Sequence, residues 1–506
     1  MAGAEIISMS APETRISGLQ YDSRKVQKGD CFFAMRGGTT DGNKYINAAL
    51  DKGAVAIVSD SPEQKPRFET AWAQIAPGHG RRVMGCASAN FYQHPARKMR
   101  LTGVTGTNGK TTTTYLLESI LAAAGKKSAL IGTIEYRIAG TVVPSPHTTP
   151  ESLDLNRFLS EALDRGAGEA VMEVSSHALE QERVYCVPFD VAIFTNLTRD
   201  HLDYHGTMEK YFEAKKVLFV GSGSPPPRVA VINTDDAYGR QLAKFANEKG
   251  SRVITYGLES GDFHAAGKPQ FTDEGMAFEM QSPLGRSSFI TQLVGTVNVY
   301  NILAAAAAAH AKGISALQIV QGVNSLPHVP GRFQRVVAGQ PYTVVVDYAH
   351  TDDALRNLTT VARDFVSRSG ESKGRVITLF GCGGDRDRAK RPMMAEAAAA
   401  GSDFIILTSD NPRSEDPLRI IHDALAGLRR AQAGTQFTIE PDRKRAIQLA
   451  CQLAKPGDIV LIAGKGHEKV QITLLGSQPF DDVEVARAAI GAARSGNSKT
   501  YRNVGA

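Results

Sequence analysis

The chain has 506 residues, a formal net charge of +6, and 42% hydrophobic and 22% charged residues. This composition excludes a mainly disordered chain, because the apolar mass is large enough to offset the entropy of ordering. It also excludes collagen, since the 48 glycines and 23 prolines follow no three-residue period. At about 150 residues per domain, the length predicts about three domains.

No segment of the sequence has the pattern of a membrane span or a secretory signal. No run approaches the ~20 apolar residues that cross a bilayer, and the first residues carry neither a basic nor a long apolar segment. The mild charge permits an anionic small substrate, but without a basic run it does not indicate nucleic-acid binding. The cysteines are scattered and no CxxC occurs, so we expect reduced thiols rather than a disulfide framework or a zinc site. They are Cys31, Cys86, Cys186, Cys382 and Cys451.

The first of three α/β blocks ends near Met99. It contains an expected strand at residues 30–35, a glycine-rich turn at 37–42, a helix at 45–52 and a strand at 54–59. The order of these elements predicts a small α/β domain over residues 1–98.

The second block, residues 99–331, begins with a strand, a phosphate-type loop and a helix. The strand is expected at 100–105 and the helix at 111–124, with Gly125 in the place of a C′ glycine. The later elements are strands at 170–174 and 191–195, a loop at 221–227, and an alanine-rich helix at 298–311 whose small side chains favour close packing.

The third block, residues 332–506, alternates strands with helical stretches. The strands are expected at 342–347, 376–380, 404–408 and 459–463. This rhythm predicts a doubly wound, mostly parallel, Rossmann-like sheet, whose ligands bind at the carboxyl ends of the strands. The fold class is therefore α/β with three domains, the central one built around a P-loop.

The strongest local signal is Gly103-Val-Thr-Gly-Thr-Asn-Gly-Lys-Thr111. Glycines let the backbone approach phosphate oxygens, and the helix N-terminus that follows attracts negative charge. Lys110 can reach the β- and γ-phosphates, and the Thr111 hydroxyl can bind Mg²⁺. The segment is one residue longer than the usual GxxxxGK[ST] pattern, but its strand–loop–helix context favours a phosphate site.

The other polar motifs of the second block are ambiguous one by one. Glu173 follows an apolar strand and is a candidate Mg²⁺ ligand, although such a residue taken alone is more often part of a surface turn. Residues 195–205 hold two Asp and two His, for which a metal or phosphate role and a solvated loop are equally compatible. By spacing alone, Lys215 is a solvated lysine on an amphipathic helix.

Four polar motifs of the third block follow its strands, and their shared position is more informative than any one of them. They are residues 347–351, 381–388, 410–413 and 464–468. The second is not a dinucleotide fingerprint, because Arg386 stands where GxGxxG needs its last glycine.

Taken together, and in this order along nearly the whole chain, the motifs resemble those of the ATP-dependent Mur ligases of peptidoglycan synthesis. Within that family they are similar to the ligases that add diaminopimelate as the third residue of the peptide. The matching segments are YDSR (21–24), TGTNGKT (105–111), HTTPE (147–151), MEVSSHAL (172–179), TNLTRDHLDYH (195–205), YFEAK (211–215), residues 295–301, GRF (331–333), DYAHT (347–351), GCGGDRD (381–387), DNPR (410–413) and GKGHE (464–468).

The resemblance implies an ATP site, two Mg²⁺ ions and a carbamylated Lys215. The implied catalytic residues are Lys110, Lys215, His201 and Glu173, and the implied metal ligands are Thr111, Glu173, His201 and Lys215. The implied ATP-binding residues are Gly106, Thr107, Asn108, Gly109, Lys110, Thr111, Thr112, Asn298, Arg332 and Asp347.

The resemblance also implies the substrates UDP-MurNAc-L-Ala-D-Glu and meso-diaminopimelate, which would be joined through an acyl phosphate. The nucleotide-sugar peptide would contact Tyr21, Ser23, Gly38, Thr39, Thr40, His147, Thr148, Thr149, Ser175, Gln181 and Arg183. Diaminopimelate would contact Arg386, Asp410, Asn411, Pro412, Arg413, Gly464 and Glu468. We expect a cytoplasmic monomer without nucleic-acid or membrane partners.

Two residues depart from the family pattern. Asp352 follows DYAHT where the family usually has proline, and His147 stands where asparagine is common. Two alternatives stay open, namely a related lysine-adding or folylpolyglutamate synthetase-like ligase, and a non-catalytic nucleotide-sugar-binding scaffold with a relic P-loop. The DNPR motif and the first block argue against the former, and the joint presence of Lys110, Glu173 and Lys215 argues against the latter. A generic P-loop kinase or motor would leave the third block unexplained.

Overall fold

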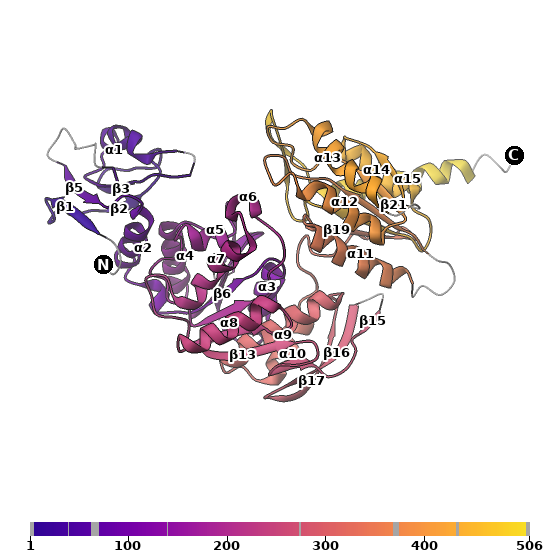
Figure 1. Cartoon of the computed structure of the whole chain (residues 1–506), viewed down its shortest axis with the longest axis horizontal. Coiled ribbons are helices and arrows are strands. Elements are labelled where there is room, and N and C mark those ends of the chain that lie inside the picture. The colour runs from indigo at the N-terminus through magenta and orange to yellow at the C-terminus, as the bar shows by residue number, and fades with distance from the viewer. Residues whose placement is uncertain are drawn as a thin grey trace.

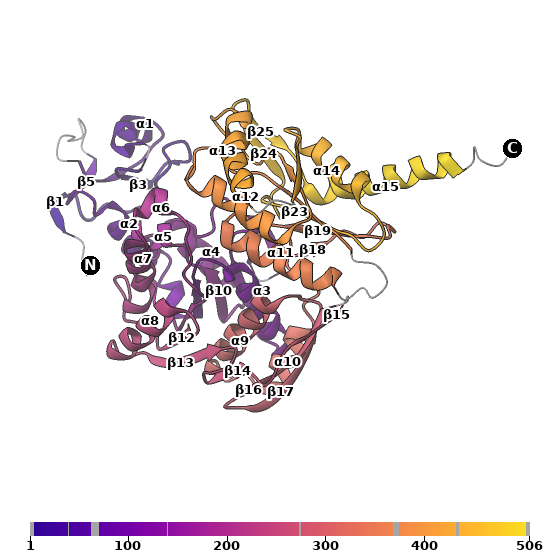
Figure 2. The same cartoon turned by 45° about the vertical axis from the view of Figure 1, so that its right-hand side comes forward.

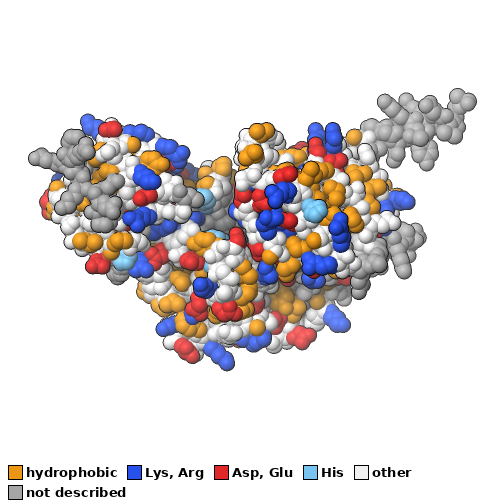
Figure 3. Space-filling model, turned by 45° about the horizontal axis from the view of Figure 1, so that its top comes forward, with side chains coloured by type: hydrophobic (Ala, Val, Ile, Leu, Met, Phe, Trp, Pro, Cys, Tyr) orange, Lys and Arg blue, Asp and Glu red, His pale blue; other side chains and the backbone are white. Residues whose placement is uncertain are grey.

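The computed structural model describes residues 5–38, 40–61, 70–138, 140–272, 275–367, 374–431 and 435–501. Three large sheets follow one another along the described chain, and each is the centre of one domain (Figure 1); β24 and β25 form a further two-stranded sheet. The C-terminal domain contacts the central one and comes forward in the view turned by 45° (Figure 2). The space-filling view shows the surface hollowed between the N-terminal and C-terminal domains (Figure 3).

The N-terminal sheet has the strand order β1-β5-β4-β3-β2. Only β1 runs antiparallel to its neighbour. All five side chains of β3 are buried, and α1 and α2 cover opposite faces with separate apolar clusters. The elements are β1 Ile6–Ser10, β2 Gly18–Gln20, β3 Asp30–Ala34, η1 Gly42–Tyr45, α1 Ile46–Asp51, β4 Ala56–Ser59, β5 Ala71–Ile75, α2 Gly80–Phe91 and η2 Pro95–Arg97.

The central sheet has a parallel core in the order β14-β13-β12-β11-β6-β10-β7, with antiparallel strands at both edges. The core strands are almost wholly buried, as expected for a parallel sheet covered on both faces. The strands are β6 Arg100–Thr105, β7 Ser128–Ile131, β8 Glu135–Ile138, β9 Thr141–Pro144, β10 Glu169–Glu173, β11 Val191–Phe194, β12 Val229–Asn233, β13 Arg252–Gly257, β14 Phe263–Ala265, β15 Gln270–Thr272, β16 Gly275–Ser282 and β17 Gly285–Thr291.

Helices cover both faces of the central sheet and bury two apolar clusters. One cluster includes the six consecutive alanines of α9, all fully buried, which confirms the expected close packing of this helix. The helices are α3 Lys110–Ala123, α4 Ser152–Asp164, α5 Ser176–Glu180, α6 Leu202–His205, α7 Met208–Val220, α8 Ala237–Glu248, α9 Thr296–Ala311 and α10 Ala316–Asn324.

The C-terminal sheet has the order β18-β19-β23-β20-β21-β22, and all of its strands except β18 are parallel. Apolar clusters lie on both of its faces, which confirms the doubly wound prediction. The elements are β18 Gln334–Arg335, β19 Thr343–Asp347, α11 Asp352–Val366, β20 Val376–Phe380, α12 Lys390–Gly401, β21 Phe404–Leu407, α13 Pro417–Arg430, β22 Gln436–Ile439, α14 Arg443–Leu453, β23 Ile459–Ala463, β24 Val470–Thr473, β25 Gly476–Pro479 and α15 Asp482–Tyr501. In the part of the chain that the structure describes, no helix is long and apolar enough to cross a membrane.

The expectation that every cysteine is a free thiol is wrong for two of them. Cys86 on α2 and Cys186 beyond α5 form a disulfide with their Cα atoms 5.6 Å apart. The bond joins residues 100 positions apart, which only the packing of α2 against the central domain brings together. Scattered spacing in the sequence could not reveal this pair. Cys31, Cys382 and Cys451 are buried and free.

Candidate functional site

The phosphate-type loop runs from β6 into α3, as predicted. Gly106 has φ +145°, and a Cβ there would lie 1.8 Å from the Thr195 hydroxyl, so only glycine fits. Lys110 is the first residue of α3, and its Nζ donates to the carbonyl oxygens of Gly106 (2.9 Å) and Thr107 (2.8 Å). The ammonium therefore lies over the loop, where it would meet phosphate oxygens.

The segment after β11 supports the loop from its side. The Thr195 hydroxyl donates to the Asn108 carbonyl at 2.6 Å, and the Asn196 amide oxygen accepts from the Asn108 N–H at 3.0 Å. The Thr107 hydroxyl donates to the Thr198 carbonyl at 3.1 Å. The motif at 195–205 thus begins as a brace for the P-loop, a role that its polar composition alone did not separate from a solvated loop.

Thr111 in the first turn of α3 and Glu173 at the end of β10 lie together, as predicted. The Thr111 hydroxyl donates to Glu173 Oε2 at 3.0 Å and accepts from Arg332 Nη2 at 3.0 Å. The Thr133 N–H and hydroxyl donate to the same carboxylate at 2.8 and 3.0 Å, and the Thr133 hydroxyl also lies 3.1 Å from that of Thr148. A hydroxyl and a carboxylate beside a phosphate loop are the hard oxygen donors that suit Mg²⁺.

Lys215 is buried, which contradicts the solvated lysine that its spacing indicated. It is 1% exposed, its Nζ donates to the Gly106 carbonyl at 2.8 Å, and it lies 4.5 Å from the centre of the Tyr211 ring. Burial, and next the charge of Lys110, lower its pKa well below the usual value for lysine. Lys215 is therefore on the inner face of α7, and its amine points toward the P-loop.

His201 belongs to a group of aromatic side chains around α6. Its ring centre lies 4.7 Å from that of His177, which in turn lies 4.2 Å from Tyr204. Burial lowers the pKa of His201 to about 3 and that of His177 to about 4, so both rings are neutral, the form that binds metals. Among the described residues, no three His, Cys, Asp or Glu side chains are grouped so as to hold a metal ion. Of the four predicted metal ligands, Thr111 and Glu173 are in hydrogen-bond contact, while Lys215 reaches the Gly106 carbonyl of the P-loop.

The predicted nucleotide residues meet between α9 and the start of the C-terminal domain. The Asn298 amide oxygen accepts from Asn301 Nδ2 at 2.9 Å, and a Cβ on Gly109 would lie 2.5 Å from Asn301 Oδ1. Asn301 therefore connects Asn298 to the P-loop. It was not among the predicted site residues, although its spacing three after Asn298 puts both on one face of the helix.

Arg332 and Asp347, which were also predicted to bind the nucleotide, lie at the start of the C-terminal domain. The Arg332 guanidinium lies 4.6 Å from the Tyr348 ring centre while it donates to Thr111. The Asp347 carboxylate accepts from the N–H groups of Phe333 (2.6 Å) and Ala349 (2.8 Å), and burial raises its pKa. Both residues are thus fixed at the domain junction. Thr112, the last of the predicted loop residues, is buried in the first turn of α3.

Two ion pairs join the segment after β11 to the C-terminal domain. Asp200 Oδ1 lies 3.1 Å from Lys390 Nζ on α12, and Arg199 Nη2 lies 3.4 Å from Asp387. Burial by itself would raise the pKa of Asp200, but Lys390 and next His201 hold it well below its usual range. Residues 195–205 of the central domain therefore touch residues 381–388 and the start of α12 in the C-terminal domain.

The two departures from the family pattern are tolerated by the local structure. Asp352 occupies the first position of α11, where an acidic side chain favours the helix dipole. The next residue, Asp353, accepts from Asn108 Nδ2 at 2.7 Å across the domain junction. The His147 side chain is exposed, and its carbonyl accepts hydrogen bonds from the hydroxyls of Tyr136 and Ser145.

The residues predicted for the peptide end of the nucleotide-sugar substrate lie together. Arg183 donates to the Thr149 carbonyl (3.0 Å) and to the Gln181 amide oxygen (2.8 Å). The Thr149 hydroxyl accepts from the Ser175 N–H at 3.1 Å. Arg183 Nε also lies 3.2 Å from Glu151, which pairs with Arg81 of α2 at 3.1 Å. This group therefore lies where α2 packs against the central domain.

The residues predicted for the uridine end lie on loops at the carboxyl edge of the N-terminal sheet. The Tyr21 hydroxyl donates to Asp154 Oδ2 of α4 at 2.6 Å, and burial, followed by this hydrogen bond, raises the pKa of Tyr21. Ser23 is half-buried after β2, and Gly38 and Thr40 are exposed after β3, the parallel neighbour of β2. Thr39 lies outside the described residues.

A buried lysine, Lys465, lies among the residues that were predicted to bind diaminopimelate. Lys465 Nζ donates to Asn411 Oδ1 and to Glu468 Oε2, both at 2.9 Å, and Asn411 Nδ2 donates to the same Glu468 oxygen at 2.8 Å. Burial would raise the pKa of Glu468, but Lys465 holds it below the usual range. Gly464 has φ +115°, and a Cβ there would lie 2.3 Å from buried Asp410. Lys465 is fully buried and was not predicted as a site residue.

Arg386 and Arg413 provide the positive charge of this end. Arg413 Nη1 donates to the Gly384 carbonyl at 2.7 Å, and Arg386 Nη1 donates to the Asp385 carbonyl at 2.9 Å. Burial, and next the charge of Arg386, lower the pKa of Arg413, so the two guanidinium groups are electrostatic neighbours. In the described ranges neither arginine forms an ion pair, which leaves two cations available to an anionic ligand. Pro412 contributes its backbone, which packs against Gly384.

Comparison with known proteins agrees with this geometry. The Mur ligase middle domain matches residues 104–309, the Mur ligase glutamate ligase domain matches 331–466, and the catalytic domain of the Mur ligase family matches 15–92. A UDP-N-acetylmuramoyl-L-alanyl-D-glutamate–2,6-diaminopimelate ligase from Solibacter usitatus is 50% identical over 486 residues, or 95% of each chain. A ligase of the same name from Geobacter metallireducens is 46% identical over 491 residues, or 94% of each chain.

Solved structures show the same architecture. A structure of a UDP-N-acetylmuramoyl-L-alanyl-D-glutamate–2,6-diaminopimelate ligase superposes with a TM-score of 0.66 and 35% identity, over 96% of this chain and 97% of that one. MurF from Acinetobacter baumannii superposes with a TM-score of 0.65 at 21% identity, over 90% of this chain and 91% of that one, which shows the shared fold. The chain belongs to the Mur ligase family.

Proposed function

We propose that this protein is the ligase that joins meso-diaminopimelate to the D-Glu carboxylate of UDP-MurNAc-L-Ala-D-Glu at the expense of ATP. The observation that carries the proposal is that Arg386 and Arg413 stand without a carboxylate partner in the described structure, on the domain that Lys390 ties to the P-loop domain. The names of the relatives from Solibacter usitatus and Geobacter metallireducens support it. The enzyme acts in the cytoplasm as a monomer.

Each domain takes one substrate in this proposal. Residues 1–98 hold the uridine end of the nucleotide sugar, residues 99–331 hold ATP, and residues 332–506 hold diaminopimelate. The peptide end of the sugar substrate extends from the N-terminal domain along Thr149 and Arg183 toward Glu173, because the Thr149 hydroxyl donates to the backbone carbonyl of Glu173 and accepts from the Ser175 N–H. This places the D-Glu carboxylate near the P-loop.

The first chemical step transfers the γ-phosphoryl group of ATP to the D-Glu carboxylate. Lys110 offsets the charge that develops on the phosphate oxygens, and Arg332 approaches the same region from the C-terminal domain. Thr111, Glu173, His201 and Lys215 would hold Mg²⁺, which supplies Lewis-acid stabilisation of the transferring phosphoryl group. The products of the step are ADP and an acyl phosphate.

Lys215 fits this step as a carbamate. Burial favours its neutral amine, which can add to the carbon of CO₂ and lose a proton to form an anionic carbamate. The reaction turns a buried amine into an anionic oxygen ligand close to the Gly106 carbonyl. A carbamate also removes the repulsion between Lys215 and Lys110.

The second step forms the amide. The neutral amine of diaminopimelate attacks the acyl carbon, the carbon–oxygen bond to phosphate breaks, and the amine loses a proton. Arg386 and Arg413 bind the carboxylate at the far end of the amino acid, and Glu468 and Asn411 bind its ammonium and carboxylate groups. The domain junction keeps water from the acyl phosphate.

A lysine-adding ligase is the closest alternative, because it needs the same P-loop chemistry. Lysine lacks the carboxylate that would neutralise Arg386 and Arg413, so its binding would leave two cations uncompensated.

The reaction is tested by incubating the protein with ATP, Mg²⁺, the nucleotide-sugar dipeptide and meso-diaminopimelate. The proposal requires a product that is heavier than the nucleotide-sugar dipeptide by one diaminopimelate residue. It also requires the release of one ADP for each molecule of this product. Consumption of ATP without such a product would reject it.

Loss of the ion pair between Asp200 and Lys390 should uncouple ATP use from amide formation. The Lys390→Met variant removes the cation that joins α12 to the segment after β11, so water reaches the acyl phosphate more often. We expect the phosphate released per amide formed to rise above unity. The matched control is Arg388→Met, which breaks an ion pair with Asp423 inside the C-terminal domain. A ratio of unity in Lys390→Met would contradict the sealing role of this contact.

A further inference from the structure

Two neighbouring loops carry the arginines of the amino-acid end. One follows β20 and the other follows β21, and these strands are adjacent and parallel. The Gly384 N–H donates to the Asn411 carbonyl at 3.0 Å, and Arg413 Nη1 donates back to the Gly384 carbonyl at 2.7 Å. A Cβ on Gly384 would lie 1.9 Å from the Pro412 carbonyl oxygen. The two loops are therefore packed backbone to backbone.

Both loops contain a residue in the left-handed region. Asp385 has φ +53° and Arg413 has φ +54°, and neither is glycine. Such backbone is costly for L-residues and persists only where the surroundings fix it. Ser414 fixes part of it, because its N–H and hydroxyl donate to the two carboxylate oxygens of Asp385 at 3.2 and 2.6 Å. One strained residue, Asp385, directly precedes Arg386, and the other is Arg413 itself.

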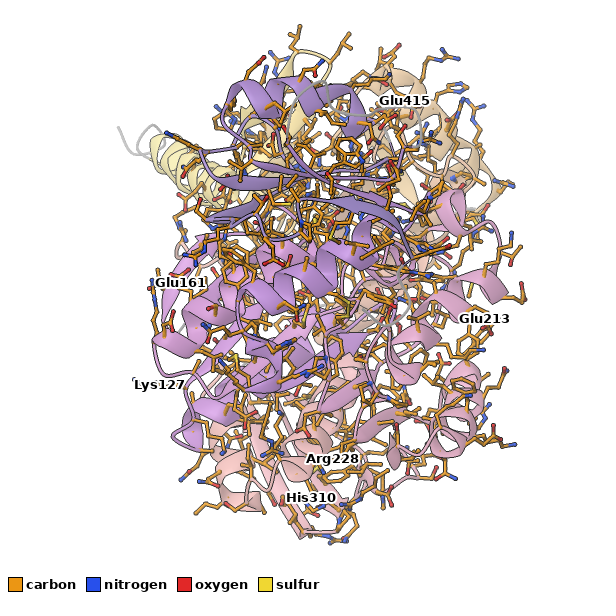
Figure 4. All side chains as sticks on the ribbon, turned by 90° about the vertical axis from the view of Figure 1, so that its left-hand side faces the viewer. Lys127, Glu161, Glu213, Arg228, His310 and Glu415 are labelled. Carbon is orange, nitrogen blue, oxygen red and sulfur yellow. A yellow bond between two sulfur atoms is a disulfide. The ribbon has the colours of Figure 1, made fainter. Side chains whose placement is uncertain are left out.

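Glu415 also holds the backbone of Asp385 in this conformation. Its Oε1 accepts from the Asp385 N–H at 2.6 Å and from Arg391 Nη2 at 2.6 Å, and its Oε2 accepts from Arg391 Nη1 at 3.0 Å. Arg391 is 1% exposed and also donates to Asp423 at 2.9 Å. Glu415 lies on the C-terminal domain, where it is labelled near the top of Figure 4. Its hydrogen bonds with Arg391 lower its pKa to about 2, so it is an anion at any working pH.

We infer that Glu415, anchored by buried Arg391, is a positioning residue that sets the preference for diaminopimelate over lysine. It holds the N–H of Asp385, and so fixes the backbone from which the next residue, Arg386, extends beside Arg413. Glu415 itself would not touch the substrate. The inference rests on the proposed function. It names the residue that keeps Arg386 and Arg413, the two cations proposed to bind the carboxylate of diaminopimelate, close together.

The physical reason is electrostatic. Two guanidinium groups repel each other, and Arg386 is exposed and free to turn away unless its backbone is held. Held side by side, they match the planar oxygens of a carboxylate with several charge-assisted hydrogen bonds. Lysine has no such carboxylate, so loosening the pair should weaken diaminopimelate binding and leave lysine binding unchanged.

The test is steady-state kinetics of Glu415→Gln with diaminopimelate and with lysine. Glutamine keeps the size but has no charge and offers one acceptor oxygen instead of the two that accept from Arg391, so the ion pair that anchors the acceptor of the Asp385 N–H is lost. We expect the KM for diaminopimelate to rise by about 10-fold, the loss of one charge-assisted hydrogen bond. The KM values for ATP and the nucleotide sugar, and the weak turnover of lysine, should stay within about twofold.

Asp423→Asn is the matched control, because it alters the other carboxylate partner of Arg391, together with the ion pair of Arg388 at the end of the first loop, and leaves the contacts that hold Asp385 in place. It should leave the KM for diaminopimelate unchanged. Ser414→Ala is a milder second variant, and it should raise the same KM by about threefold through the lost bond to Asp385. Should Glu415→Gln fail to fold, Ser414→Ala decides the matter alone.

The inference is overturned if the variants lower the melting temperature while the ratio of kcat/KM for diaminopimelate to that for lysine stays at the wild-type value. It is also overturned if the KM for ATP rises as much as that for diaminopimelate, since this would show a general loss of structure. Absence of turnover in the wild-type protein would instead reject the proposed function. The two failures are therefore distinguishable.

Discussion

Lys110→Ala is expected to lower kcat by about three orders of magnitude, the cost of losing a cation on a transferring phosphoryl group. Lys110 is the residue whose ammonium lies directly over the Gly106–Thr107 backbone, where the phosphates would bind. Its removal leaves the charge that develops in the transition state uncompensated. The KM for the nucleotide sugar should change by less than about threefold, because that substrate binds mainly elsewhere.

The matched control is Lys127→Ala. Lys127 is an exposed lysine of the same domain, which Figure 4 labels at the edge of the molecule. Its loss should leave kcat unchanged. Rates are compared by coupled detection of ADP at saturating substrates. Turnover of Lys110→Ala close to that of the wild type would overturn the assignment of the loop as the phosphate site.

Lys215→Ala is the second large effect, with an expected fall in kcat of about 100-fold or more as an anionic metal ligand is lost. Because the proposed ligand is a carbamate, a small carboxylate such as acetate or formate could occupy the space that the side chain leaves. We expect added acetate to restore part of the activity of Lys215→Ala. Lys215→Arg should be inactive and insensitive to acetate, since arginine remains a cation.

Lys216→Ala is the control for this experiment. Lys216 is the next residue on α7 and forms an ion pair with Glu213, which is labelled on the surface in Figure 4. Its activity should match the wild type with and without acetate. Full activity of Lys215→Ala in the absence of acetate would show that Lys215 provides no metal ligand.

The parts of the fold that could be predicted are those with strong local signals. β20 and β23 have the predicted bounds, and the predicted helix after the P-loop is displaced by one residue from α3. Buried parallel strands are continuous apolar runs, which is why they stand out. The short edge strands, such as β8, β9 and β15, are not apolar runs, and their pairing depends on the neighbouring strand rather than on their own composition.

The candidate site likewise contains residues whose proximity could be predicted from the sequence and residues whose burial could not. Glu173 and Thr111 meet because parallel strands end at one edge of a sheet, a rule that needs only the strand order. The prediction for Lys215 was wrong, because the spacing of residues on one helix does not show which face of the helix the rest of the chain covers. Lys465 and Arg391 were not predicted for a similar reason: buried charges are rare, and each is retained here by partners from distant segments.

Contacts between domains were beyond prediction from the sequence. The pairs Asp200–Lys390 and Cys86–Cys186 join residues 190 and 100 positions apart. Neither residue of either pair belongs to a motif whose chemistry requires the other. Their proximity results from how whole domains pack, which no local pattern of the sequence records.

The central claim is most directly tested by the rate of phosphate release from ATP and Mg²⁺ with UDP-MurNAc-L-Ala-D-Glu, measured with meso-diaminopimelate and with L-lysine in parallel. The two amino acids differ in the carboxylate that Arg386 and Arg413 would bind. The account predicts rapid release with diaminopimelate and a rate lower by about 100-fold or more with lysine. Equal rates, or a faster rate with lysine, would contradict it.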